Sequence, residues 1–366
     1  MRRHWIDNLR WVTILLVLLY HVIYFYNNKG VFGGVGGFSD GPQYQDILLY
    51  ALYPWFMPLL FLLAGVSARY ALVRQTASEW FKSRTRKLLV PSTIGLFLLH
   101  WITGYFNTHL GGNDVLAAVP QPVKFVVWSL NGTGPLWFIQ VLWLLSLTLL
   151  IIRRIDSKDR FWSLCGKANM AGIVLLGMLL FWLGEQTLIQ HPRLQSADGL
   201  FNLYKPLFYI IPFLMGYFLF SHDEVQEQIA KAWMPLMGAA MVTGITLVAT
   251  TFGQDYTSPQ YLGSVLCNVY GYLMCLAMIG WFKSCFDSTN RFASYMTHSS
   301  FGIYIVHYVV IASLGYLMKY NTQLPPKVIY TTLIIAVFTL SPALYEVLHR
   351  IPIVRWCLFS EKAVKQ

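Results

Sequence analysis

The chain has 366 residues, of which 56% are hydrophobic and 12% are charged, and its formal net charge is +11. An ordinary soluble domain carries about 25% charged residues, so this chain has too few charges to cover a soluble surface. The positive charge by itself would suit nucleic-acid binding. No soluble segment is long enough to gather basic residues on one face, however, and this class is excluded.

Apolar runs separated by charged or Pro/Gly-containing breaks predict the membrane spans. Crossing a hydrocarbon core about 30 Å thick takes about 20 helical residues. Ten runs fit this length: 9 to 27, 46 to 72, 88 to 106, 135 to 152, 169 to 186, 203 to 220, 233 to 252, 261 to 282, 299 to 318 and 328 to 347. The first run lacks a small-residue cleavage site, so it is expected to remain in the mature protein. The sequence therefore predicts an all-α integral membrane protein, a bundle of about ten transmembrane helices, with one membrane domain over residues 1–366 and no fused soluble domain.

The distribution of basic residues predicts how the spans are oriented. If the N-terminus is cytoplasmic, the inner segments collect most of the 27 Lys and Arg residues. The outer segments then hold only Lys29, Lys124, Arg193, Lys205, Lys319 and Lys327. Because basic residues concentrate in the cytoplasmic segments of membrane proteins, both termini are expected to face the cytoplasm.

The first span carries two ionisable residues, Arg10 and His21, that lie eleven residues apart. This separation is close to three helical turns and roughly 16 Å of rise, so the two side chains share a face. Asp7 precedes Arg10 by three residues and can pair with it at the cytoplasmic end of the span. An ionisable residue such as His21 within a bilayer suggests a function, although polar helix packing also uses histidine, and both interpretations stay open.

The distance between the two residues adds a chemical argument. The planar fork of an arginine pairs with phosphate, and a neutral histidine takes a proton from an attacking hydroxyl. A donor with phosphates at one end and a reactive thioester at the other, the shape of acyl-coenzyme A (acyl-CoA), spans such a distance. A simple ion pair does not account for the gap.

Five stretches in chain order resemble the membrane acyltransferase-3 family. Arg10, ten residues and then His21 resemble the first-span signature of that family. Residues 56–69 (FMPLLFLLAGVSAR) resemble the family's second span, and residues 84–91 (RTRKLLVP) resemble its basic cytoplasmic loop before the third span. Residues 135–138 (PLWF) and 302–307 (GIYIVH) resemble its fourth-span and ninth-span patterns. The resemblance extends over most of the chain and is greatest to the branch that contains glucans biosynthesis protein C.

The resemblance implies a membrane O-acyltransferase of the bacterial cytoplasmic membrane. Such an enzyme moves an acetyl or succinyl group from cytoplasmic acyl-CoA, a donor substrate rather than a bound cofactor, to a hydroxyl of an extracytoplasmic carbohydrate of the cell envelope. His21 is expected to act as general base or to carry a transient acyl group, and the sequence leaves both mechanisms open. The residues expected to bind the donor's phosphates are Arg10, held by Asp7, with Arg69, Arg84, Arg86 and Lys87.

The basic loop departs from the family pattern at one position. The family often has Arg-x-x-Arg there, whereas this chain has Arg84 at the first arginine position and Lys87 in place of the second arginine, with Arg86 beside it. A lysine holds phosphate only as a point charge, so which of these residues contacts the donor stays open. The positive-inside rule accounts for the same cluster equally well.

Other polar and aromatic residues in or near the spans have two interpretations each. Trp137 either lines an acyl or sugar channel or belongs to the interfacial aromatic belt. His307 is either a second polar group that faces the substrate cavity or a packing histidine. Glu185 and Glu346 lie near span ends, where water is expected to reach them, and neither is expected to be catalytic.

Several other chemistries have no motif in the sequence. The chain has no His-Glu-x-x-His or paired-Cys spacing for a metal, no glycine-rich phosphate loop and no Gly-x-Ser-x-Gly elbow. The main alternative function is a permease or flippase that moves a glycan or lipid-linked glycan without covalent chemistry, because polar residues in broken spans suit that class as well. A structural subunit of a glycan-synthesis complex is the third possibility.

Overall fold

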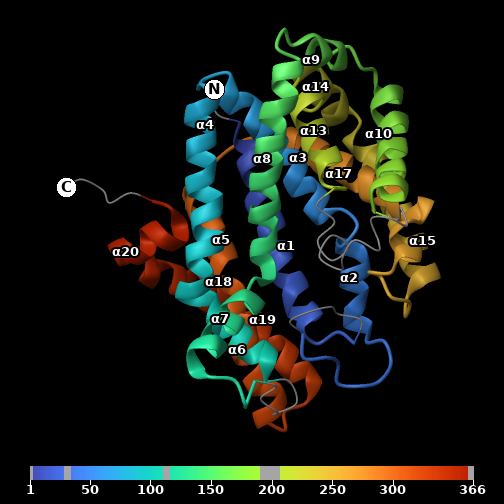
Figure 1. The fold of residues 1–366 in the computed structure, drawn as a ribbon. Helices are drawn as coiled ribbons and strands as arrows, with labels where there is room; N and C mark the ends of the chain where they lie inside the picture. Colours follow the sequence, from blue (N-terminus) through green and yellow to red (C-terminus); the bar gives the residue numbers. More distant parts are fainter. Residues whose placement is uncertain (1–2, 29–33, 110–115, 190–206, 362–366) are drawn as a thin grey trace. The chain divides into compact units, whose positions relative to one another are not determined.

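The computed structural model describes residues 3–28, 34–109, 116–189 and 207–361. In these ranges every regular element is helical: α-helices joined by short 3₁₀-helical and π-helical turns (Figure 1). The prediction of an all-α protein is therefore confirmed.

Nine helical stretches of the described residues are long and apolar enough to cross a membrane. They are His4–Phe25, Tyr44–Leu72, Ala77–Thr108, Gly134–Ile155, Met170–Leu188, Trp233–Thr251, Val265–Cys285, Arg291–Asn321 and Pro326–Arg350. Each overlaps one of the predicted spans. The remaining predicted span, 203 to 220, begins outside the described residues, and the structure shows only its second half, as α13 (Ile210–Phe218).

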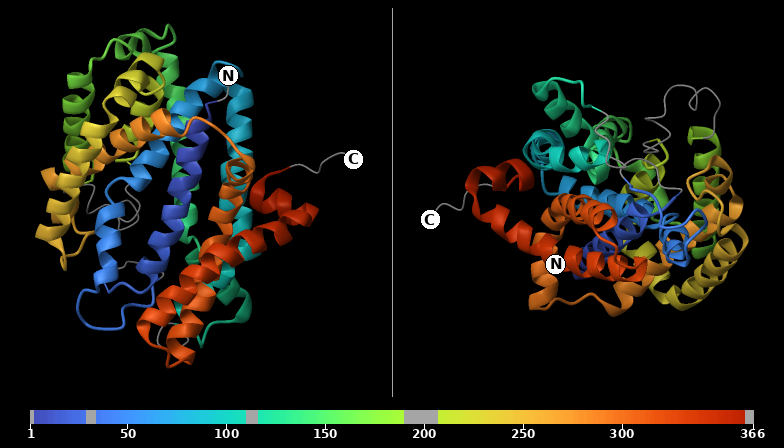
Figure 2. Two further views of the ribbon diagram at one scale, coloured as in Figure 1. Left: turned by 180° about the vertical axis from the view of Figure 1, so that it is seen from behind. Right: turned by 90° about the horizontal axis from the view of Figure 1, so that it is seen from below.

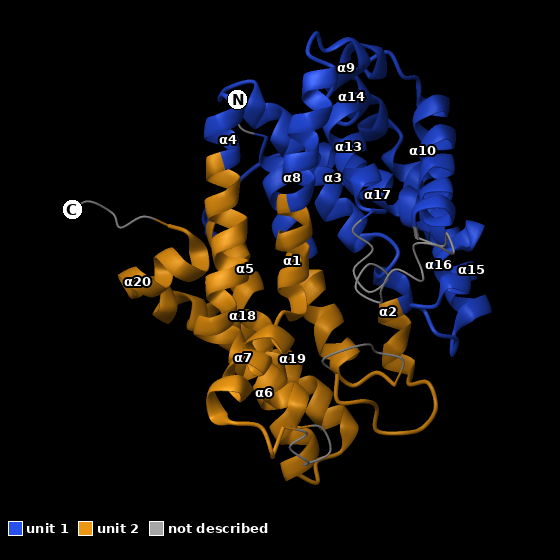
Figure 3. Cartoon of the chain, in the orientation of Figure 1, with its two compact units in different colours: residues 1–13, 50–81, 144–297 blue, residues 14–49, 82–143, 298–366 orange. Residues whose placement is uncertain are grey.

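The chain forms two compact units, coloured separately in Figure 3. Unit 1 comprises residues 1–13, 50–81 and 144–297, and unit 2 comprises residues 14–49, 82–143 and 298–366. Helix α1 (His4–Phe25) is unbroken and contributes to both, so Arg10 belongs to unit 1 and His21 to unit 2. Each unit combines segments that are distant in sequence. The predicted single membrane domain stays a prediction.

Unit 1 is organised around α17 (Val265–Cys285), which is buried along most of its length and packs against α10, α14 and α15. A second pairing joins α3 and α13. The elements that lie wholly in unit 1 are α3 (Phe56–Leu72), α9 (Arg160–Cys165), α10 (Met170–Gly184), η6 (Glu185–Ile189), α13, α14 (Asp223–Lys231), α15 (Trp233–Thr251), α16 (Pro259–Leu262) and α17. Four further helices continue from one unit into the other: α2 (Ile47–Leu52), α4 (Ala77–Arg84), α8 (Trp137–Ile155) and α18 (Arg291–Asn321).

Unit 2 contains a tight helical pair, α6 and α7, coloured cyan to green in Figure 2. A Cβ atom built on Gly104 of α6 would lie 1.7 Å from the carbonyl oxygen of Trp128 in α7, so only glycine permits this approach. The elements of unit 2 are η1 (Tyr44–Asp46), η2 (Thr85–Leu89), α5 (Val90–Gly95), η3 (Leu96–His100), α6 (Trp101–Thr108), α7 (Gln121–Asn131), η5 (Gly134–Leu136), α19 (Pro326–Arg350), α20 (Pro352–Val354) and η7 (Arg355–Phe359).

The basic stretch predicted as a loop before the third span is helical instead, and that prediction was wrong. Helix α4 starts at a capping box, in which Thr76 Oγ1 accepts from the Glu79 amide at 3.3 Å and the Glu79 carboxylate accepts from the Thr76 amide at 3.0 Å. Helical turns then follow one another from Ala77 to Thr108. Lysine and arginine are good helix formers, so charge marks where the lipid ends and does not mark where the helix ends.

Candidate active site

Arg10 is held from two sides within unit 1. Its Nη1 donates to Asp7 Oδ1 at 3.2 Å, which confirms the predicted pair, and its Nη2 donates to Ser67 Oγ at 2.8 Å. Ser67 itself donates to the Leu63 carbonyl oxygen at 2.8 Å, so its lone pairs are left to accept from the arginine. The Arg10 side chain remains 36% exposed, so its guanidinium is oriented and still accessible to an anion.

His21 lies in unit 2 and contacts the second histidine of interest. Its Nδ1 lies 3.1 Å from Nε2 of His307. The rings of Tyr20, Tyr24 and Tyr308 stand edge-on to the His21 ring, with centroids 5.4, 6.2 and 5.2 Å away. His21 is half-buried, whereas His307 is fully buried at 0% exposure. The two histidines belong to different sequence motifs, and the fold brings them into hydrogen-bond distance.

His307 is fixed by the turn of α18 that precedes it. Its Nδ1 lies 2.6 Å from the carbonyl oxygen of Tyr304, and the Tyr304 hydroxyl donates to the carbonyl oxygen of Pro135. Tyr304 also meets the Phe138 ring edge-on at 6.0 Å. The ninth-span and fourth-span motifs therefore meet beside His21, through contacts of both backbone and side chain.

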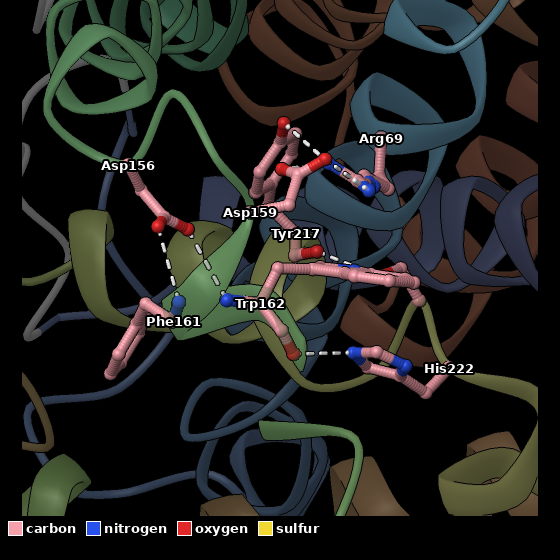
Figure 4. A network of polar contacts seen from close by, with 8 residues as sticks. Arg69, Asp156, Asp159, Phe161, Trp162, Tyr217 and His222 are labelled. Atoms are coloured by element: carbon pink, nitrogen blue, oxygen red, sulfur yellow. Dashed lines mark hydrogen bonds and ion pairs between the residues drawn. The ribbon is translucent and has the colours of Figure 1, made fainter. Parts of the chain in front are cut away.

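Arg69 is engaged within the protein. Its Nη1 and Nη2 donate to the two carboxylate oxygens of Asp159 at 2.8 and 3.1 Å, and its Nη1 lies 3.3 Å from the Tyr217 hydroxyl (Figure 4). The guanidinium carbon sits 4.1 Å from the centroid of the Trp162 ring, and Arg69 is only 7% exposed. The bidentate pair joins α3 to the start of α9, so the geometry gives Arg69 a structural role. A donor-binding role for it stays a prediction that no contact supports.

The segment around Trp162 is itself held by polar contacts. The Asp156 carboxylate accepts from the backbone amides of Phe161 and Trp162 at 3.1 and 3.2 Å, which caps α9 (Figure 4). His222 Nε2 lies 2.8 Å from the Trp162 carbonyl oxygen, and the rings of the two residues stack with centroids 3.9 Å apart. Trp162 therefore presents a fixed ring face to Arg69.

The remaining predicted donor-binding residues lie in unit 2. Arg84 ends α4 and is half-buried, and Lys87 in η2 is exposed. The Arg86 carbonyl oxygen accepts from Ser360 Oγ at 2.5 Å, and Arg86 Nε is buried without a hydrogen-bond partner in the described chain. Trp137 is half-buried, with its ring centroid 6.4 Å from that of Phe138. Their assignment to the donor or to a channel stays a prediction.

Glu185 corrects one expectation. It was expected to be reached by water, but it is only 2% exposed, in the π-helical turn that follows α10. It lies close enough to Tyr53 and Tyr209 to act on them electrostatically. Hydropathy places a residue along the membrane normal, but it does not say whether lipid, water or another helix covers that residue.

Residues that sequence reasoning missed lie inside or beside the motifs it used. Ser67 belongs to the second-span stretch and Tyr304 to the ninth-span stretch. Tyr308, which stands against His21, follows the same stretch. Their positions inside or directly after these motifs were a usable signal, but only the contacts show which neighbours they orient.

The comparisons with known proteins identify a family. The model of the acyltransferase-3 family, described as an acyltransferase domain, matches residues 3–346. No match was found among curated proteins or among solved structures. The matched range contains the first-span arginine and histidine, the basic segment before the third span and both later motifs. The chain belongs to the acyltransferase-3 family and is a multi-pass membrane acyltransferase.

Proposed function

We propose that this enzyme transfers an acetyl or succinyl group from cytoplasmic acyl-CoA to a hydroxyl of a carbohydrate on the outer side of the bacterial cytoplasmic membrane. Family membership supplies the reaction class. The donor, the acyl group and the acceptor are inferred from the chemistry of the residues and from the resemblance.

The observation that carries the proposal is the contact with His307 that holds the ring of His21. His307 lies 3.1 Å from one ring nitrogen, and His21 itself is only half-buried. A histidine with one nitrogen held in this way offers the other nitrogen for proton transfer. We therefore assign His21 the role of general base, which is supported by its position in a membrane span, where an ionisable side chain is costly without a function.

In the proposed reaction, the acceptor hydroxyl, the thioester and His21 account for every bond and proton that changes. The acceptor hydroxyl gives its proton to His21 while its oxygen attacks the thioester carbonyl carbon. The carbon–sulfur bond breaks, coenzyme A leaves as a thiolate, and the thiolate takes the proton from the His21 imidazolium. An acyl-enzyme on His21 is the alternative route, and it predicts label retained on the denatured protein.

Arg10 is the proposed contact for the donor's phosphates. It lies on the same unbroken helix as His21, eleven residues earlier, which corresponds to roughly 16 Å of rise. Asp7 and Ser67 hold its guanidinium, and the side chain remains accessible. Arg84, Arg86 and Lys87, which belong to unit 2, stay candidates for donor binding on the strength of the resemblance alone. Arg69 is left out because its donors are directed at Asp159.

The test uses purified protein in liposomes with radiolabelled acetyl-CoA or succinyl-CoA and a cell-envelope glycan extract. The wild type should label the glycan, and His21→Ala should lower the rate about 10²–10⁴-fold, the usual contribution of a general base. His4→Ala, on the same helix, is the matched control and should keep the wild-type rate. Glycan transport that persists in His21→Ala, with no acyl transfer by the wild type, would establish the permease alternative instead.

A further inference from the structure

We propose that His307 is a positioning residue that fixes the ring tautomer of His21, so that Nε2 of His21 is the basic nitrogen. This inference rests on the proposed role of His21 as the base. It gives His307 a task other than contact with substrate.

The protonation of His307 follows from its backbone partner. A carbonyl oxygen only accepts hydrogen bonds, so the His307 nitrogen that lies 2.6 Å from the Tyr304 oxygen, Nδ1, carries a hydrogen. A second proton would create a fully buried imidazolium, which is costly in a membrane span. Within the described chain, the titratable groups beside His307 are His21, His100 and the phenols of Tyr304 and Tyr308, and none of them is a carboxylate that would stabilise such a charge. His307 is therefore neutral, and its Nε2 is a bare acceptor.

The tautomer of His21 then follows. Its Nδ1 lies 3.1 Å from the bare Nε2 of His307, so it is Nδ1 that carries the hydrogen and donates. A neutral imidazole has one such hydrogen, which leaves Nε2 of His21 with a lone pair. Nε2 is thus the nitrogen that can take a proton from a hydroxyl.

The support for His307 is itself rigid. Tyr304 is tied at both ends, because its carbonyl oxygen accepts from His307 and its hydroxyl donates to the Pro135 carbonyl oxygen. Pro135 begins the fourth-span motif, so the contact explains physically why two motifs far apart in sequence serve one histidine. Small displacements of an orienting group cost rate, because proton transfer requires a set geometry.

His307 also stabilises the charge that forms during the reaction. When Nε2 of His21 takes the hydroxyl proton, the bond from Nδ1 to His307 becomes charge-assisted and stronger. The proton on Nδ1 of His307 stays where it is, since the Tyr304 carbonyl oxygen cannot take it. His307 therefore orients and polarises His21 without relaying a proton, the part that a carboxylate takes in a Ser-His-Asp triad.

A second hydrogen-bond acceptor beside His21 could favour the other tautomer, in which Nδ1 is the basic nitrogen. The carbonyl oxygen of Val17, one turn before His21 in α1, also accepts a hydrogen bond from the His21 ring. A hydrogen bond from Nε2 of His21 to that oxygen would place the hydrogen on Nε2 and leave Nδ1 as the base. The two tautomers differ in one measurable property, the protonation of Nε2.

The direct test is nitrogen-15 NMR of the full-length protein in lipid, with histidine labelled at Nε2 alone. The difference spectrum between wild type and His21→Gln assigns the His21 signal. We expect the signal of an unprotonated Nε2 of His21 in the wild type and of a protonated Nε2 of His21 in His307→Phe. A protonated Nε2 in the wild type overturns the inference, whatever the substrate of the enzyme.

The kinetic test separates positioning from packing. His307→Phe should lower kcat about 10²-fold, in the range lost when an orienting partner is removed, while KM for the labelled acyl-CoA stays unchanged. His307→Gln, whose amide oxygen can still accept from His21, should recover part of kcat. His298→Phe makes the same change at an exposed position of α18 and is the matched control. An unchanged kcat in His307→Phe contradicts the inference.

The failures of the two proposals are distinguishable. If His21→Ala retains acyl transfer, then His21 is not the base and the proposed mechanism fails. If His21→Ala is inactive but His307→Phe and the wild type share the same rate and tautomer, only the positioning role fails.

Discussion

Arg69 shows what a buried cation in a span requires. A charge removed from water is tolerated when a partner and further hydrogen bonds replace its solvation. Asp159 provides both carboxylate oxygens, and the Trp162 ring covers the guanidinium face. Asp159 adopts a left-handed backbone conformation with φ of 52°, a geometry that asparagine also tolerates. The pair can therefore be tested by removing charge without straining the backbone.

The Arg69–Asp159 pair should contribute to stability in a pH-dependent way. The hydrogen bond from Arg69 lowers the pKa of Asp159 from its ordinary value of 3.8. A depressed carboxyl pKa stabilises the fold above the ordinary value, and this contribution is lost as the pH falls through the lower folded value. Asp159→Asn should therefore lower the thermal midpoint at neutral pH, and its deficit relative to wild type should shrink below about pH 4.

Thermal unfolding of both proteins across this pH range measures the effect. Asp40→Asn, at an exposed carboxylate, is the control and should match the wild type throughout. A deficit in Asp159→Asn that stays constant down to pH 3 would show that charge pairing is not its cause.

A second prediction at the residue scale concerns Arg10. Arg10→Ala should raise KM for acyl-CoA roughly 10-fold or more, because a charge-assisted contact to phosphate is worth about 1.5–3 kcal/mol. Arg10→Lys should recover only part of that loss, since the fork held by Asp7 and Ser67 is gone. Initial rates over a range of donor concentrations give both values. Donor affinity that stays at the wild-type value in Arg10→Ala would remove the phosphate role.

At the scale of elements, small residues determine which helices touch. Helices in lipid gain little hydrophobic energy from association, so close backbone packing matters more. A Cβ atom built on Gly65 of α3 would lie 2.0 Å from the Phe213 carbonyl oxygen of α13, and one on Gly216 of α13 would lie 2.0 Å from the Leu62 carbonyl oxygen. The two glycines therefore fix how closely α3 and α13 approach.

Gly65→Ala should push α3 and α13 apart. Overpacking of this kind costs about 1–3 kcal/mol, and backbone atoms cannot move aside as a side chain would. Gly238→Ala in α15 is the matched control, because its added methyl group meets nothing within 4 Å and should be neutral or stabilising by up to about 1 kcal/mol. Thermal midpoints in one detergent compare the three proteins, and equal midpoints for wild type and Gly65→Ala would contradict the packing argument.

At the scale of the whole molecule, the predicted orientation in the membrane can be tested directly. The basic residues favour cytoplasmic ends for the chain. A fluorescent protein fused to the C-terminus should therefore fluoresce, and alkaline phosphatase fused there should be inactive. Fusions after Gln323, between α18 and α19, should give the opposite pair of results. Active phosphatase at the C-terminus would reverse the predicted topology.

The sequence by itself determined the properties that depend on one segment at a time. Nine spans, the all-α class and the pairing of Asp7 with Arg10 follow from composition, apolar length and a separation of three residues within one helix. Family membership came from short motifs in a fixed order. These signals are local, because the free energy of placing a segment in lipid depends mainly on that segment's own residues.

What only the tertiary structure decided are the contacts between distant segments. His21 and His307 are 286 residues apart, and Arg69 and Asp159 are 90 residues apart. Hydropathy does not encode such pairs, because lipid is as apolar as the helix faces and the choice of neighbour rests on packing and on hydrogen bonds. The burial of Glu185 escaped prediction because it depends on the elements that cover this residue. Sequence thus placed Arg10, its partner Asp7 and His21 on one helix, and the fold added Ser67 beside the arginine and His307 beside the histidine.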